Sequence, residues 1–222
     1  LGVELWIKRD DATAGAEAGN KIRKLELLLA QAVAERSDVI LTCGGVQSNH
    51  ARATALTAAR LGLPSVLFLR VHDVTARLPL SGNVLLDRFA GADIHAISAA
   101  QYRERDQLMA DAATTLARTG RRPYVVPEGG SNGLGALGYV LAVRELRDQL
   151  SVGLGGGRPF DVIAHACGSG GTAAGLTYAA KALGVAPRVR TFAVCDDAET
   201  FTRRIVSIMA EIDAILGGPS IE

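Results

Sequence analysis

Hydrophobic positions along the chain follow two different periods. Short apolar runs bounded by glycine, proline or polar residues predict strands at 39–42, 65–69, 124–127, 162–164 and 188–194, with a first strand at 1–8 and a weak one at 92–96. Longer segments with apolar residues at i, i+3 and i+4 predict helices at 20–33, 51–61, 83–89, 101–118, 134–150, 173–183 and 197–216. Strands therefore alternate with helices through most of the chain.

This alternation is typical of an α/β fold with parallel sheets whose faces are covered by helices. Ligands of such sheets bind at the carboxyl ends of the strands. Glycine-rich or polar turns follow the predicted strands at 39–42, 124–127 and 162–164. The sequence thus predicts that these turns converge on one cleft.

Composition narrows the class of partner. The 222 residues include 24 Lys and Arg against 23 Asp and Glu, so a net charge of +1 gives no field that would attract nucleic acid or an acidic membrane. Residues 162–180 lack charged side chains, but their glycines and polar residues make a poor membrane span. Three cysteines without metal-ligand spacing indicate reduced thiols in a cytoplasmic protein. A small molecule is the expected partner, with no metal.

The turn at Gly168, Ser169, Gly170, Gly171 and Thr172 is the strongest candidate site. It lies between a predicted strand and a predicted helix. Glycines let successive backbone N–H groups approach a ligand, and the helix N-terminus adds unpaired donors and a positive dipole end. Such a turn suits an anion, most often a phosphate. The alternative is a glycine turn that only allows close packing.

Lys21 lies at the start of the predicted helix 20–33. A cation is unfavourable there, and this environment would lower the pKa of the amine and leave more of it neutral and nucleophilic. The alternative is a solvated surface lysine, as Lys24 beside it is expected to be.

Ser48, Asn49 and His50 follow the strand at 39–42 and start the next predicted helix. They could form a second anion site suited to a carboxylate, with side chains added to backbone donors. Simple N-capping by Ser48 or Asn49 explains the same residues equally well.

Two cofactors from different functional classes could use the glycine turn. Gly168, Gly170 and Ala173 match a loose dinucleotide pattern, and Asp196 follows at the distance and strand end expected of a ribose partner. A dinucleotide would leave Lys21 and the Ser48–His50 segment without a role. Pyridoxal phosphate needs a phosphate site, an amine and polar partners for its ring, and the sequence offers all three.

Four motifs also carry a resemblance to a known family. They are Gly19-Asn20-Lys21-x-Arg23-Lys24-Leu25-Glu26, Gly44-Gly45-x-Gln47-Ser48-Asn49-His50, Pro127-x-Gly129-Gly130-Ser131-Asn132 with Leu134-Gly135, and Gly168-Ser169-Gly170-Gly171-Thr172. In order and spacing they resemble the D-cysteine desulfhydrase and 1-aminocyclopropane-1-carboxylate (ACC) deaminase family of the tryptophan synthase β-like group of pyridoxal phosphate enzymes. The resemblance spans nearly the whole chain.

The resemblance implies a role for each site residue. Lys21 would hold pyridoxal phosphate covalently and then move the substrate's Cα proton. Asn49 would bond the ring hydroxyl, and Ser48 with His50 would bind the substrate carboxylate. The turn from Gly168 to Thr172 would hold the phosphate. His50 resembles the desulfhydrase side, because the deaminases tend to carry Gln at this position.

The resemblance also implies the architecture and the reaction. We expect two parallel-sheet three-layer domains of the tryptophan synthase β type, with residues 1–24 and 131–222 in a larger cofactor-binding domain and 25–130 in a smaller one. The family usually has Gly where Ala18 stands. Its chain is also longer at the C-terminus, where it supplies a partner for the pyridine nitrogen and a tyrosine implicated in ring opening. The implied protein is a homodimeric lyase that acts on a small amino acid by β-elimination, most readily D-cysteine, with the deaminase or a related C–S lyase as the alternative.

Overall fold

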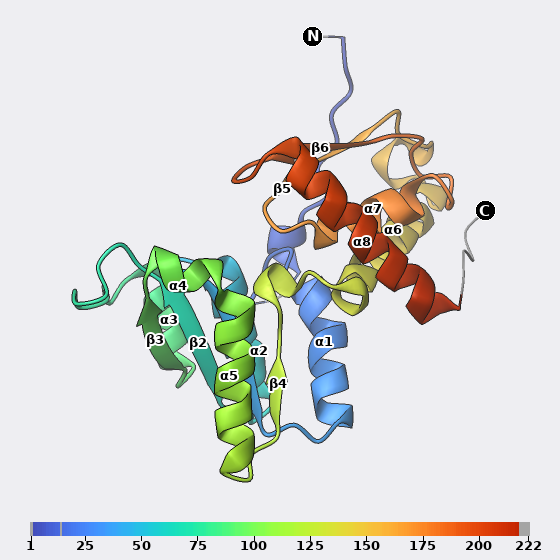
Figure 1. Cartoon of the computed structure of the whole chain (residues 1–222). Coiled ribbons are helices and arrows are strands. Elements are labelled where there is room, and N and C mark those ends of the chain that lie inside the picture. Colours follow the sequence, from blue (N-terminus) through green and yellow to red (C-terminus); the bar gives the residue numbers. More distant parts are fainter. Residues whose placement is uncertain (1, 14, 218–222) are drawn as a thin grey trace. The chain divides into compact units, whose positions relative to one another are not determined.

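Two compact units make up the chain. The computed structural model describes residues 2–13 and 15–217 (Figure 1). Contacts divide the chain into Leu1–Thr13 with Ser131–Glu222, here called the terminal unit, and Ala14–Gly130, here called the middle unit. The second boundary falls at the position expected from the sequence. At the first boundary, residues 15–24, Lys21 included, group with the middle of the chain and not with the expected larger domain.

The middle unit is built on a four-stranded parallel sheet of order β3-β2-β1-β4. Its strands are β1 (Val39–Gly45), β2 (Ser65–Arg70), β3 (Asp93–Ile97) and β4 (Pro123–Val125). The helices are α1 (Ile22–Ala34), α2 (Asn49–Arg60), α3 (Gly82–Phe89), α4 (Ala99–Arg103) and α5 (Arg105–Arg118), and a 3-10 turn, η2 (Glu128–Gly130), follows β4. The strand at 92–96 and the helix at 83–89 expected from the sequence are confirmed to within a residue or two.

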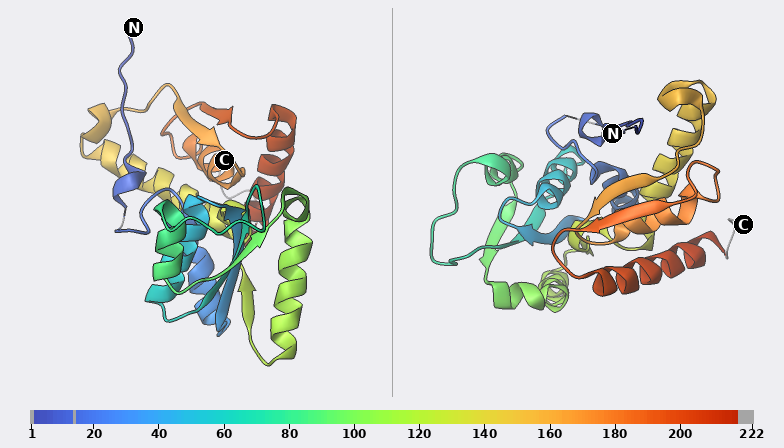
Figure 2. Two further views of the ribbon diagram at one scale, coloured as in Figure 1. Left: turned by 90° about the vertical axis from the view of Figure 1, so that its left-hand side faces the viewer. Right: turned by 90° about the horizontal axis from the view of Figure 1, so that it is seen from above.

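Alternating side chains of the strands place a core on each face of this sheet. On one face Leu41 and Phe68 pack with Met109 and other residues of α4 and α5. On the other face Leu67 and Leu69 pack against Ala51 and Ala55 of α2. The left view of Figure 2 shows the sheet between α5 on one side and α1, α2 and α3 on the other. The middle unit therefore has the three layers expected of a parallel α/β fold.

The terminal unit contains a two-stranded parallel sheet of β5 (Ile163–Cys167) and β6 (Val189–Ala193). Its helices α6 (Gly133–Ser151), α7 (Gly171–Ala180) and α8 (Ala198–Leu216) pack together (Figure 1). A Cβ on Gly175 would lie 2.3 Å from the carbonyl oxygen of Ala136, so this glycine allows α7 to pack closely on α6. Helices cover the face of the sheet that carries Ile163 and Val189, while Phe192 on the other face is 62% exposed.

The strand expected at residues 1–8 is wrong for the residues that the structure describes. Residues 2–9 have no regular structure, and a short 3-10 turn, η1 (Asp10–Ala12), follows them. Among the described residues nothing pairs with this segment in a ladder, and Leu5 and Ile7 are 84% and 72% exposed. An apolar alternation predicts a strand only where a neighbouring strand supplies hydrogen bonds.

One expected helix is divided in the structure, and a further 3-10 turn follows α6. The helix expected at 101–118 is divided at Glu104 into α4 and α5, with Ser98 and Gln101 forming a capping box at the start of α4. The segment after α6 contains a 3-10 turn, η3 (Leu154–Gly157), in which Gly155 and Gly156 have positive φ. The described helices include none that is long and apolar enough to cross a membrane, and no cluster of three or more potential metal ligands occurs in residues 2–13 and 15–217. Cys43 and Cys167 are buried, whereas Cys195 is exposed.

Asp87 on α3 is a carboxyl group inside the middle unit. It is 1% exposed, and its Oδ1 has no hydrogen-bond partner. Burial raises the pKa of Asp87 to about 7, and the positive charge of Arg52 only partly opposes this. Because the folded-state pKa lies above the unfolded value, the protonated form stabilises the fold below about pH 4, and this contribution is lost as the pH rises towards 7.

The variant Asp87→Asn should remove this pH dependence. Between pH 5 and pH 8 the free energy of unfolding of the wild type should fall by roughly 2 kcal/mol relative to that of the variant. Urea unfolding at several pH values measures this difference, with Asp111→Asn on the exposed side of α5 as the control for charge. Parallel curves for the wild type and Asp87→Asn would contradict the assignment.

Candidate active site

The glycine turn of the terminal unit has the geometry of an anion site. It leaves β5 at Cys167 and enters α7 at Gly171, and Gly170 at the N-cap has a φ of +93° that favours glycine. Gly170 offers no side-chain cap, and the first turn of α7 carries no acidic residue. The donors at this helix N-terminus are therefore not neutralised by a carboxylate, as a phosphate site requires.

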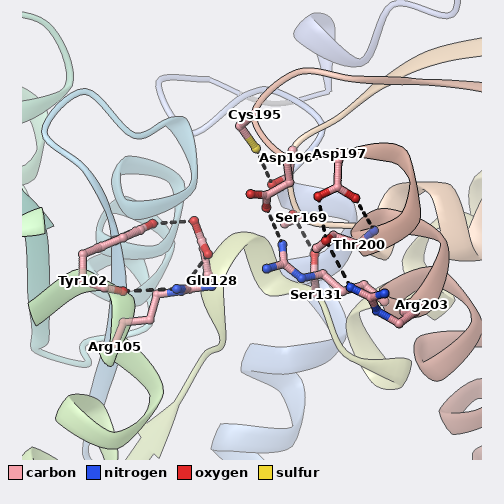
Figure 3. A network of polar contacts seen from close by, with 12 residues as sticks. Tyr102, Arg105, Glu128, Ser131, Ser169, Cys195, Asp196, Asp197, Thr200 and Arg203 are labelled. Carbon is pink, nitrogen blue, oxygen red and sulfur yellow. Dashed lines mark hydrogen bonds and ion pairs between the residues drawn. The ribbon is translucent and has the colours of Figure 1, made fainter. Parts of the chain in front are cut away.

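Ser131 organises this turn. Its Oγ lies 2.8 Å from the Oγ of Ser169 and accepts a hydrogen bond from the backbone N–H of Gly171 at 3.2 Å (Figure 3). The next residue, Asn132, caps α6 by accepting from the N–H of Gly135 at 2.8 Å. The motif at 127–132 includes Ser131, but the sequence indicates no role for this residue. Only the fold shows that its hydroxyl reaches a turn 38 residues further along the chain.

In the middle unit, the segment after β1 forms the N-terminus of α2. Ser48 is its N-cap and accepts a hydrogen bond from the N–H of Ala51 at 3.1 Å. The capping interpretation of Ser48 is thus confirmed, whereas its contact with a substrate carboxylate stays a prediction. A Cβ on Gly44 would lie 2.5 Å from the Ser48 side chain, which explains glycine at the end of β1.

Asn49 and Gln47 connect the N-termini of α2 and α3. The Oδ1 of Asn49 accepts a hydrogen bond from Nδ2 of Asn83 at 3.0 Å, and Oε1 of Gln47 accepts from the backbone N–H of Asn83 at 2.7 Å. Asn49 remains exposed. Its side chain is therefore held by a neighbour and open to solvent, as a ligand-binding amide should be.

His50 is buried and held in one tautomer. It is 4% exposed, and its Nε2 lies 2.8 Å from the Oγ1 of Thr42. The hydroxyl of Thr42 donates its single proton to the carbonyl of Val126 at 2.8 Å, so Nε2 of His50 must be the donor in the other bond. In the neutral ring Nδ1 is then an acceptor, and it has no hydrogen-bond partner.

The charge state of His50 follows from its surroundings. Burial lowers the pKa of His50 well below its ordinary value, the positive charges of Lys21 and Lys24 lower it further, and a backbone contact with Pro127 opposes this shift only in part. Lys21, Lys24 and His50 therefore lie close enough to interact within the middle unit. A neutral ring whose free nitrogen is an acceptor cannot donate from that nitrogen to a carboxylate. The expected contact between His50 and a substrate carboxylate stays a prediction. In this tautomer Nδ1 has no proton to donate to it.

Lys21 is the N-cap of α1, immediately before its first turn, and is half-buried. Lys24, expected to be a solvated surface residue, is instead 1% exposed. Its Nζ donates a hydrogen bond to the carbonyl of Gly129 in η2 at 3.0 Å. A Cβ on Gly130 would press on the side chains of Lys24 and Leu28, and this glycine has a φ of +61°. The turn after β4 thus packs directly on the helix that begins at Lys21.

A polar cluster that the sequence did not indicate holds this turn. Glu128 accepts a hydrogen bond from the hydroxyl of Tyr102 and pairs with Nε of Arg105 at 2.8 Å (Figure 3). The guanidinium of Arg70 lies 4.8 Å from the centre of the Tyr102 ring. The charges of Glu128 and Arg105 also act on the thiol of Cys43. Burial raises the pKa of this thiol to about 12, so it stays protonated. No motif links these residues, which lie on five different elements.

Asp196 has an internal partner. It pairs with Arg204 of α8 at 2.9 Å, and Asp197 caps α8 by accepting from the N–H of Thr200 at 2.7 Å. A further contact joins the thiol of Cys195 to the carbonyl of Gly168 at 3.4 Å (Figure 3). The two aspartates after β6 therefore stabilise the start of α8, and no ribose is needed to account for them.

Comparison with known proteins identifies the family. Residues 1–219 match the family described as pyridoxal-phosphate dependent enzyme. The chain belongs to this family. Pyridoxal phosphate is the cofactor of its members, and the family decides against the dinucleotide interpretation of the glycine turn.

The chain is similar to proteins named D-cysteine desulfhydrase and to proteins named ACC deaminase. It is 44% identical over 208 residues to a bifunctional D-cysteine desulfhydrase/ACC deaminase of Arabidopsis thaliana, covering 90% of this chain and 51% of that protein. It is 38% identical over 220 residues to a D-cysteine desulfhydrase of Yersinia enterocolitica, covering 98% and 64%. A crystal structure of an ACC deaminase homologue matches with a TM-score of 0.83 and 39% identity, covering 97% of this chain and 62% of that one. The chain thus spans about half to two-thirds of these relatives.

The residues present fit pyridoxal phosphate. In the terminal unit the turn from Gly168 to Thr172 offers backbone donors and hydroxyl groups without an acidic neighbour. In the middle unit Lys21 offers an amine, and the side chain of Asn49 is exposed. The donors of the glycine turn thus suit a phosphate, and the middle unit offers an amine and an amide of the kind that pyridoxal phosphate needs. The residue roles implied by the resemblance stay predictions.

The tautomer of His50 can be tested directly. We expect its ring to stay neutral, with the proton on Nε2, from pH 8 down to pH 5.5, because burial and two cations oppose a second proton. Nitrogen-15 NMR of labelled imidazoles measures both the charge and the tautomer. Thr42→Val, which removes the acceptor of Nε2, should alter the tautomer. A titration midpoint near 6.5 in the wild type would contradict this assignment.

Proposed function

We propose that the protein is a pyridoxal phosphate-dependent lyase that cleaves D-cysteine to pyruvate, ammonia and sulfide. The family match over residues 1–219 carries this proposal. The residues support it: Lys21, Asn49 and a neutral His50 belong to the middle unit, and the turn suited to an anion belongs to the terminal unit. The names of the relatives support the same class of reaction.

Each residue would have a limited task in this reaction. Pyridoxal phosphate supplies an electron sink that makes the Cα proton of an amino acid removable. Lys21 would join the cofactor through its amine and would take the Cα proton as the C–S bond breaks and sulfide leaves from Cβ. The turn from Gly168 to Thr172 would fix the phosphate, and Asn49 would donate its amide to the ring hydroxyl. The backbone N–H groups at the N-terminus of α2 would bind the substrate carboxylate, with Ser48 and His50 around them.

D-cysteine fits these groups better than the cyclopropane acid does. D-cysteine has a Cα hydrogen and a good leaving group on Cβ, so one base at Lys21 is enough for elimination. The cyclopropane substrate has no Cα hydrogen and needs a further group for ring opening. The deaminase remains the second candidate, because relatives of Pyrococcus horikoshii and other organisms, at 40% identity and nearby values, carry that name. A related C–S lyase belongs to the same class.

We propose further that the enzyme acts in the cytoplasm, as its cysteine pattern indicates, and that it forms a homodimer, as the resemblance implies. The net charge of +1 favours neither nucleic acid nor an acidic membrane as a partner. Size-exclusion chromatography with light scattering measures the assembly, and a mass of one chain at micromolar concentration would contradict the dimer.

Reductive labelling tests the role of Lys21. Pyridoxal phosphate followed by borohydride should attach a phosphopyridoxyl group to the peptide that contains Lys21, because reduction fixes the bond between amine and aldehyde. Peptide mass spectrometry locates the label, and Lys21→Ala should lose it. Lys181, an exposed lysine of the terminal unit, serves as the matched control through Lys181→Ala, which should be labelled at Lys21 like the wild type. A label spread over surface lysines, with none at Lys21, would contradict the role of Lys21.

Substrate choice needs one assay of pyruvate release. D-cysteine should give pyruvate at least tenfold faster than the cyclopropane acid at equal concentration, since only D-cysteine offers a proton to Lys21 at Cα. Sulfide released in equal amount identifies the elimination. Faster release from the cyclopropane acid would contradict the desulfhydrase and favour the deaminase. L-cysteine in a parallel assay reports the stereochemistry.

A further inference from the structure

Residues 15–20 form the loop that leads into Lys21, and α2 holds this loop at two points. The Nη2 of Arg52 donates a hydrogen bond to the carbonyl of Ala18 at 2.6 Å. Arg60, two turns further along α2, pairs with Glu17, whose carboxylate side chain is only 7% exposed. Both arginines lie on the middle unit's α2, and both contacts fall on residues just before Lys21.

The contact of Arg52 lies close to the chemistry in sequence and in space. Ala18 is three residues before Lys21, and Arg52 is one turn after Asn49. Gly19 between Ala18 and Lys21 has a φ of +124°, which glycine adopts without strain, so the glycine itself does not fix the direction of the chain and a contact on Ala18 can do so. A charged donor to a backbone carbonyl is well suited to this, since such bonds are stronger than neutral ones.

The surroundings of Arg52 indicate that its place is not set by stability alone. Its Nε is buried without a hydrogen-bond partner. The charge of Arg52 also acts on the carboxyl group of Asp87 on α3. Asp87 is 1% exposed, and its Oδ1 has no hydrogen-bond partner. Unpartnered buried polar atoms destabilise a fold, so an arginine kept in this environment suggests another role.

We propose that Arg52 is a positioning residue, which fixes the loop 15–20 and thereby holds Lys21 in register with Asn49 and His50 on the first turn of α2. The α2 helix then carries the ring-binding and carboxylate-binding groups at its N-terminus and the anchor of the amine along its side. Arg60 and Glu17 form a second and more exposed anchor. This inference rests on the proposed function for the role of Lys21, but the anchoring of the loop does not.

Two measurements on Arg52→Gln test the proposal separately. Hydrogen exchange of the protein without added cofactor should show residues 18–22 exchanging at least tenfold faster than in the wild type, because the anchor is lost. Labelling of Lys21 by pyridoxal phosphate and borohydride should slow by roughly tenfold, since misplacement of a reacting group by about 1 Å has large effects on rate. With D-cysteine, kcat should fall more than KM changes.

Control variants separate positioning from folding. Arg88→Gln changes the same charge at an exposed site of α3 and should match the wild type in exchange and labelling. Arg52→Lys keeps the charge and should restore part of the labelling rate, which a purely structural role would not require. Glu17→Gln should have a smaller effect of the same kind. Arg52→Gln removes packing contacts of the long side chain as well as its charge and could unfold the protein. Arg52→Lys keeps the charge and most of the side-chain length, so it still tests the proposal if the Gln variant unfolds.

The outcomes distinguish this proposal from the proposed function. Unchanged exchange at residues 18–22 in both Arg52 variants would overturn the positioning role. A wild type that is not labelled at Lys21 would overturn the proposed function, and hydrogen exchange would still decide whether Arg52 anchors the loop. Faster exchange with an unchanged labelling rate would show an anchor without influence on Lys21, and it would also overturn the proposal.

Discussion

The hydroxyl of Thr42 is the contact on which the candidate residues of the middle unit depend. It is fully buried near the end of β1, donates to the carbonyl of Val126 after β4 and accepts from His50 at the start of α2. Hydrophobic burial stabilises the sheet but has no direction, whereas these two bonds fix a strand, a turn and a helix in one orientation. The tautomer of His50 is a consequence of this arrangement.

The position of Lys21 follows from the same edge of the sheet. The turn after β4 is fixed from one side by Tyr102 and Arg105 through Glu128, and it presents the carbonyl of Gly129 to Lys24 on the other. Lys24 lies one turn into the helix that Lys21 precedes. A buried ammonium without partners would be very unfavourable, so the bond to Gly129 constrains where α1 can begin. Two anchors therefore converge on Lys21, one through α1 and one through the loop before it.

The sequence predicted the elements with regular periodicity and the turns that carry glycine. All strands of the middle unit and the turn at 168–172 follow from local pattern, because burial on a parallel sheet imposes it. The strand at 1–8 was wrong, since pairing depends on a neighbour that local pattern cannot supply. The burial of Lys24 could not be predicted either, because its partner Gly129 lies 105 residues away. Ser131 was visible as part of a motif, but its contact with the turn before α7 depends on packing within the terminal unit.

The buried polar atoms that lack partners are unevenly distributed. Among residues 2–13 and 15–217 they all lie in the middle unit, and they include Nδ1 of His50, Nε of Arg52 and Oδ1 of Asp87. Each destabilises the fold by about 1–3 kcal/mol relative to a satisfied group. Apolar residues at these positions would favour stability, so their concentration around α2 is a sign of function. By contrast, Ser131 satisfies the turn before α7 internally. Most of the polar atoms without partners thus lie near the α2 side of the middle unit, while in the terminal unit Ser131 bonds both Ser169 and the N–H of Gly171.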